Sequence, residues 1–193
     1  MIEKFNKIFD LVKSQDFLDG LSTGGEIPFY IITYDIKEEN LLTESIDLLY
    51  KRLKNEGKKA TIIDLHDKMI EALTEDDELE DYYDLEGDIS TREFTQTIHL
   101  ASNIDRTFIP NIAKTIDNEK PDLVLLKGVG RIYPFIRSHT IVNRLENIIK
   151  NIPIVLFYPG TYVGTQLSLF GRIKSENHYR AINIQDIQLY TKS

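Results

Sequence analysis

The chain has no cysteine among its 193 residues, which excludes disulfide bonds, thiolate metal sites and a cysteine nucleophile. Its longest apolar run, Ile152 to Tyr158, is far shorter than the ~20 residues that a membrane-spanning helix needs. The first residues, Met1 to Lys7, carry charge where a secretory signal is apolar. These absences predict a cytoplasmic globular protein, large enough to bury a core without a metal or a cross-link.

The standard phosphate-binding motifs are also missing. Gly57-Lys58 is not a Walker A loop, because Arg52 stands where the first glycine belongs and no Ser or Thr follows the lysine. Gly128-Val-Gly130 is not a dinucleotide fingerprint, because Tyr133 occupies the position of the third glycine. The four histidines show no metal-ligand spacing, and no catalytic triad is readable. We therefore expect no metal and no cofactor, and the sequence names no catalytic residue.

The net charge of −8 is unevenly distributed along the chain. Residues 1–120 carry 14 basic and 27 acidic side chains, whereas residues 121–193 carry nine and four. Nine of the fourteen residues from Glu75 to Asp88 are acidic, which is typical of a solvated loop or helix face. The overall acidity argues against direct nucleic-acid binding, although the C-terminal third leaves room for a local basic face.

Apolar runs that favour strands alternate with helical patterns. Strands are predicted at residues 28–34, 60–63, 122–126, 154–158 and 179–184. Helices are predicted within residues 2–13, 40–56, 66–73 and 134–148, with another after the Ser90–Glu93 capping box that Pro110 kinks or splits.

Because each strand is a continuous apolar run, the sheet should be covered on both faces. The sequence thus predicts an α/β fold: an open, mainly parallel, three-layer sheet with helices on both faces. It would be P-loop- or Rossmann-like without a phosphate-binding motif. We expect one domain over 1–193, with an N-terminal helix within 1–20 and an acidic helical or loop insertion at about 66–120.

Ligands of such sheets bind at the loops beyond the carboxyl ends of the strands. Two loops there are rich in glycine, tyrosine and arginine: Lys127 to His139 and Tyr158 to Gly171. They could be structural turns, a protein-contact surface or an anion site. The candidate binding residues are Gly128, Gly130, Arg131, Tyr133, Arg137, His139, Tyr158, Pro159, Gly160 and Tyr162.

Three further expectations concern these loops. Gly128 or Gly130 should have a positive φ or a close backbone neighbour. In a helix opened by Pro134, Arg137 and His139 should point apart, with Arg137 paired to a carboxylate or carbonyl and His139 nearer the packing side. The strand-end residues Asp35, Asp64 and His66 could hold Mg²⁺, but strand-end aspartates more often cap helices.

Several of these segments together resemble the BrxB-like family of the BREX (bacteriophage exclusion) defence systems. The resemblance is carried by Gly25 to Asp35, Gly128 to His139, Phe157 to Tyr162, Leu169 to Gly171 and Tyr179 to Ala181. It implies a role in phage resistance beside a DNA methyltransferase, a large ATPase and an alkaline-phosphatase-like protein. It implies no catalytic residue, and favours an adaptor to partners such as the phosphatase-like protein. The alternative is a nucleotide- or nucleic-acid-binding module that uses the Gly128–Gly130 loop and the nearby arginines.

Overall fold

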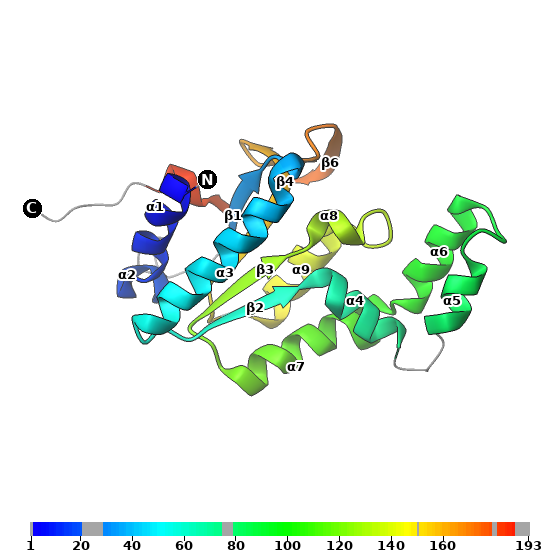
Figure 1. Ribbon diagram of the computed structural model, residues 1–193, viewed down its shortest axis with the longest axis horizontal. Coiled ribbons are helices and arrows are strands. Elements are labelled where there is room, and N and C mark those ends of the chain that lie inside the picture. The colour runs from blue at the N-terminus through cyan, green and yellow to red at the C-terminus, as the bar shows by residue number, and fades with distance from the viewer. Residues whose placement is uncertain (1, 21–28, 75–78, 150, 179–180, 188–193) are drawn as a thin grey trace, which may run out of the picture.

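The computed structural model describes residues 2–20, 29–74, 79–149, 151–178 and 181–187 (Figure 1). Its α-helices are α1 (Ile2–Val12), α2 (Gln15–Leu18), α3 (Glu39–Asn55), α4 (Leu65–Leu73), α5 (Leu79–Leu85), α6 (Thr91–Ala101), α7 (Ile109–Glu119), α8 (Val129–Ile132) and α9 (Ser138–Ile148). Its strands are β1 (Phe29–Tyr34), β2 (Ala60–Asp64), β3 (Leu123–Lys127), β4 (Ile154–Val163), β5 (Gln166–Leu169), β6 (Ile173–His178) and β7 (Ile182–Asn183). None of these helices is long and apolar enough to cross a membrane.

The strands form one mostly parallel sheet in the order β2-β3-β4-β1-β7. The far half of β4 leaves this sheet and pairs antiparallel with β5, which pairs antiparallel with β6. The carboxyl ends of β1, β2, β3 and the parallel part of β4 therefore share one edge, and the β4–β5–β6 hairpin stands over it (Figure 1).

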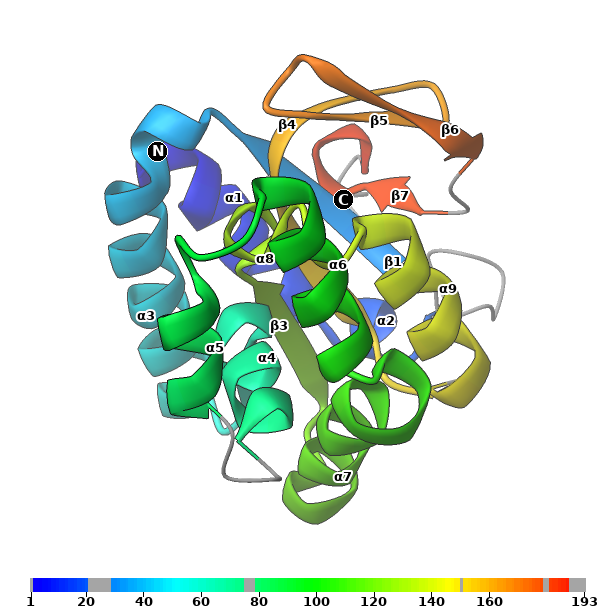
Figure 2. The same ribbon diagram turned by 90° about the vertical axis from the view of Figure 1, so that its right-hand side faces the viewer.

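Helices cover both faces of the sheet, which confirms the predicted three-layer α/β fold (Figure 2). Alternate residues of each strand point into two separate cores. Tyr30 and Ile32 pack with α1, α2 and α3, while Phe29 and Ile31 pack with α4, α7, α8 and α9. The apolar runs of the sequence are thus strands buried on both sides.

The helix boundaries follow local chemistry. Leu42, Ile46, Leu49 and Leu53 form the buried stripe of α3, as their spacing predicts. The predicted capping box is present at α6, where the Ser90 hydroxyl accepts from an amide of the first turn and a carboxylate reaches back. Helices α5 and α6 lie side by side as a helical pair that projects from the body (Figure 1, right).

One predicted boundary is confirmed and two need correction. Of the two alternatives at Pro110, a kink or a split, the structure shows the split: α6 ends at Ala101, and the proline lies in the first turn of a second helix, α7, where its missing amide costs nothing. Pro134 does not open a helix but lies in the connection between α8 and α9. Of the predicted strand at 179–184, only Ile182–Asn183 pairs with β1; residues 179 and 180 lie outside the described residues.

Candidate functional site

The carboxyl edge of the sheet is organised around the carboxylate of Asp64, at the end of β2. Its side chain is only 10% exposed and lies against two cations, Lys127 at the end of β3, at 3.5 Å, and Arg131 of α8, in direct hydrogen-bond contact. One Asp64 oxygen also accepts from the amide of His66 at 3.0 Å and so caps α4. Asp64 thus ties together the ends of two neighbouring strands.

The expectation that strand-end aspartates cap helices is confirmed. Asp35 accepts from the amide of Lys37 at 3.0 Å and opens a short 3₁₀ turn (Ile36–Glu38), just as Asp64 opens α4. Within the residues that the structure describes, no group of three or more Asp, Glu or His side chains could hold a metal ion. The alternative of a Mg²⁺ site therefore gains no support at this edge.

Gly128 occupies the left-handed region with φ 91°, which confirms the prediction for the first glycine loop. A Cβ built at this position would lie 2.6 Å from Asp64 Oδ1 and 3.2 Å from the amide nitrogen of Leu65. At Gly130 a Cβ would lie 3.1 Å from both Phe170 and Pro159. The chain's own atoms therefore occupy the space beside both glycines, which explains why neither position has a side chain.

The second glycine-rich segment, expected to be a loop from Tyr158 to Gly171, is instead the β4–β5 hairpin. Gly160 permits it: with φ 147°, its missing Cβ would otherwise lie 2.1 Å from the carbonyl oxygen of Ser168. The hydroxyl of Tyr162 donates to the carbonyl of Ala181 at 2.8 Å. Pro159, Gly160 and Tyr162 thus build the hairpin and its contacts with the body.

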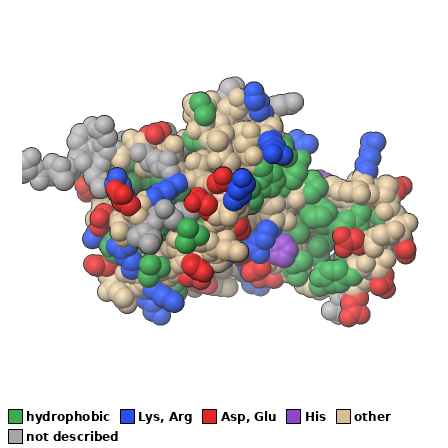
Figure 3. Space-filling model, turned by 45° about the horizontal axis from the view of Figure 1, so that its top comes forward, with side chains coloured by type: hydrophobic (Ala, Val, Ile, Leu, Met, Phe, Trp, Pro, Cys, Tyr) green, Lys and Arg blue, Asp and Glu red, His purple; other side chains and the backbone are tan. Residues whose placement is uncertain are grey.

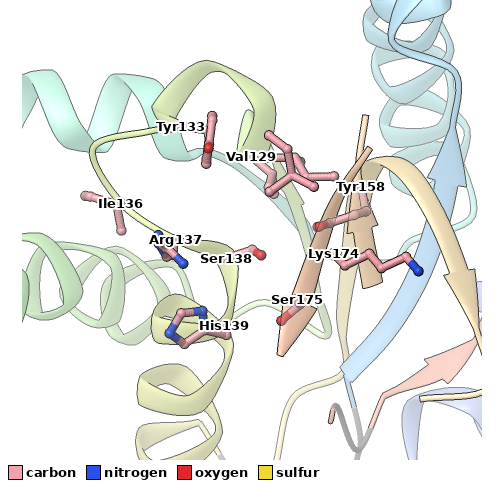
Figure 4. Close-up of a pocket in the computed structure, with 11 residues that line it drawn as sticks. Val129, Tyr133, Ile136, Arg137, Ser138, His139, Tyr158, Lys174 and Ser175 are labelled. Atoms are coloured by element: carbon pink, nitrogen blue, oxygen red, sulfur yellow. The ribbon is translucent and has the colours of Figure 1, made fainter. Parts of the chain in front are cut away.

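Four of the ten candidate residues meet at one cavity of about 290 Å³ between the start of α9 and the hairpin. Figure 4 shows Tyr133, Arg137 and His139 on one side of it, and Tyr158 and Ser175 on the other. Partial burial, together with the Arg137 charge, lowers the pKa of His139, so its ring is neutral at pH 7. Lys174 borders the cavity too, but its amino group points away from it (Figure 4).

The predicted separation of Arg137 and His139 is wrong. It assumed a helix that begins at Pro134, whereas α9 begins at Ser138 and Arg137 precedes it in extended conformation (φ −87°, ψ 139°). The helical angle between the two side chains therefore does not apply, and both line the same cavity. Among the described residues, Arg137 has no carboxylate or carbonyl partner, contrary to the pairing we expected.

Sequence reasoning missed the hairpin's contribution to this cavity. Leu169, Ile173, Lys174 and Ser175 close its far side, but they come from β5 and β6, which were not predicted. The signal was present in Gln166-Leu-Ser-Leu169, whose apolar residues alternate and point inward.

The fold and this edge together define a class: a three-layer α/β protein whose strand-end loops are packed with its own side chains, with an open cavity beside them. A family model described as "BREX protein BrxB" matches residues 61–184. A protein of that name from Bacillus cereus (strain H3081.97) is 37% identical over 190 residues, covering 95% of this chain and 97% of the relative. The chain belongs to the BrxB family.

A second relative supports the same assignment. "BREX protein BrxB" from Escherichia coli O9:H4 (strain HS) is 29% identical over 182 residues, covering 94% of this chain and 90% of the relative. No solved structure matches the chain significantly. The resemblance expected from the glycine, tyrosine and arginine segments is confirmed, and family membership points to a component of a BREX phage-defence system.

Proposed function

We propose that this chain is a non-catalytic adaptor of a BREX system, acting in the cytoplasm. It would bind other BREX proteins, such as the alkaline-phosphatase-like component, and through them the ATPase and the methyltransferase. The observation that carries the proposal is that the charged side chains at the strand ends form ion pairs with one another. Asp64 pairs with Arg131 and Lys127 and packs against Gly128, which supports a structural function of these groups.

The same observation weighs against the alternative of a nucleotide-binding module. The Asp64 carboxylate lies directly beside Gly128, so it would repel a nucleotide phosphate held at this loop. By contrast, the cavity beside α9 presents tyrosine, arginine and histidine to solvent, which are residue types suited to protein contacts. We therefore favour protein recognition at the cavity side of the sheet edge.

Co-purification from the complete operon tests the proposal. An affinity tag on this chain, expressed with its native BREX operon, should retain at least one other BREX protein, and a tag on an unrelated protein of similar charge should not. Retention of no BREX protein, in cells that still restrict phage, would refute the adaptor function.

Thermal melting of the purified chain with nucleotides tests the alternative. A nucleotide at a hundred times its dissociation constant adds about 2.7 kcal/mol, which for a chain of this size raises the melting temperature by roughly 5–10 °C. We expect no such rise with ATP, ADP or GTP. A rise that disappears in Arg131→Gln would replace the adaptor by a nucleotide-binding module.

A further inference from the structure

Two hollows of the surface meet at Arg137. One is the cavity between α9 and the hairpin. The other is a groove of about 630 Å³ between α6 and the α8–α9 connection, lined by residues that include Arg92, His99 and Phe135. Arg137 lines both, so the two hollows adjoin at this side chain, and together we call them the Arg137 groove.

The walls of the Arg137 groove are held in place by packing and by a hydrogen bond. The ring of Phe135 meets Phe94 of α6 edge to face, with centroids 6.1 Å apart and an interplanar angle of 81°. His99 Nδ1 lies 2.8 Å from the carbonyl oxygen of Phe135, so this nitrogen carries the proton and donates. These contacts join α6 to the connection, and the groove is therefore formed before any partner arrives.

The groove is basic, although the chain as a whole is acidic. Arg92 and Arg137 are exposed, and among the residues described as lining either hollow none is Asp or Glu. The cavity at the end of β1, in contrast, is lined by Asp35 and Glu38. In a chain of net charge −8, a path free of carboxylates is a local site for negative charge.

We infer that the Arg137 groove docks an extended acidic segment of a partner protein. Its carboxylates would lie on Arg92 and Arg137, and an apolar side chain would pack on Pro134 and Phe135. This inference rests on the proposed adaptor function and names the chemistry of the segment that the adaptor recognises.

A peptide fits the surroundings better than a nucleic acid. Helix α5, beside α6 in the projecting pair, carries Glu80, Asp81 and Asp84. The space-filling view shows acidic side chains at the outer end of this pair and hydrophobic ones between it and the body (Figure 3). A strand of phosphates needs a continuous basic track, which two arginines do not provide, whereas a few carboxylates need only these two arginines.

The test uses the purified full chain and defined probes. Fluorescence anisotropy would follow a labelled peptide of about 16 residues that alternates Asp or Glu with Leu or Phe, a matched peptide with Lys in place of the acids, and a labelled DNA oligonucleotide. The variants are Arg137→Glu and Arg92→Glu. Lys51→Glu, at an exposed position of α3 on the opposite face of the sheet, makes the same charge change away from the groove.

We expect the acidic peptide to bind, the lysine peptide not to bind, and each groove variant to weaken binding about tenfold or more. Lys51→Glu should bind as the wild type does. Equal binding by the groove variants, no binding of the acidic peptide, or DNA binding that depends on Arg137 would each overturn the inference. Melting temperatures equal to the wild type establish that the variants are folded.

Co-purification with the tagged chain, expressed from its operon, distinguishes a failure of this inference from a failure of the proposed function. If the wild type and Arg137→Glu retain the same BREX proteins, the adaptor function stands and the groove assignment fails. If the wild type retains none, the adaptor function itself fails. Loss of a BREX protein with Arg137→Glu, but not with Lys51→Glu, supports both.

Discussion

Replacing Gly128 by alanine tests whether the first glycine loop serves the fold. An alanine held at φ 91° costs about 1–2 kcal/mol. Its methyl carbon would lie 2.6 Å from Asp64 Oδ1, so the carboxylate must move away from the amide of His66 that it caps. Loss of such a cap costs about 1 kcal/mol, and we expect Gly128→Ala to destabilise the chain by about 2–3 kcal/mol in total.

Gly57 provides the matched control. It also has a positive φ, 76°, but an added Cβ there meets nothing within 4 Å. Gly57→Ala should therefore cost only the backbone part, about 1–2 kcal/mol. Urea unfolding followed by circular dichroism measures the free energy of unfolding of both variants. In thermal unfolding, each kcal/mol of lost stability should lower the melting temperature by about 2–4 °C.

The contact with Asp64 is isolated by a double-mutant cycle. In an Asp64→Ala background the obstructing oxygen is gone, although the amide nitrogens of Leu65 and His66 remain at 3.2 and 3.3 Å, so Gly128→Ala should cost less than it does in the wild-type background. If Gly128→Ala and Gly57→Ala cost the same in the wild-type background, the loop does not depend on its contact with Asp64. The structural interpretation of the loop would then be refuted.

Three other predictions follow from the described contacts. Gly160→Ala should cost at least about 3 kcal/mol in urea unfolding, because its Cβ would lie 2.1 Å from the Ser168 carbonyl oxygen; a smaller loss would mean that the hairpin shifts easily. Ser90→Ala should cost about 1 kcal/mol by removing the cap of α6, and an unchanged urea midpoint would contradict the capping box. Arg137→Gln should raise the pKa of His139 toward, but not to, 6.5 in an NMR titration, because burial remains; an unmoved pKa would show that the ring does not sense this charge. Because the folded pKa of His139 is lowered, the unfolded state binds its proton more readily, and this residue's contribution to stability should rise with pH up to about 6.5.

Most of the sheet was predictable because its signal is local. The central strands are uninterrupted apolar runs, and the structure places β1 to β3 within a residue or two of their predicted bounds. The hairpin was missed despite the alternating pattern of Gln166 to Leu169, because Pro159-Gly160 is typical of a turn when considered alone. Only the approach of Ser168 shows that the glycine lets two strands pass closely.

The candidate site was predictable in composition but not in arrangement. Tyr133, Arg137, His139 and Tyr158 were named from two separate segments, and the structure brings them to one cavity. The contact between Gly128 and Asp64 joins residues far apart in the chain, so no local pattern could predict it. The sheet order decides such contacts, because it places the end of β2 beside the end of β3.

The position of β1 inside the sheet has a consequence for synthesis on the ribosome. Phe29 to Tyr34 pair with Ile154 to Pro159 on one side and with Ile182 and Asn183 on the other. An apolar strand made early therefore has no partner until the last part of the chain has left the exit tunnel. Through most of translation β1 can only collapse with α1 and α3 or bind a chaperone, and chains truncated before β4 should aggregate.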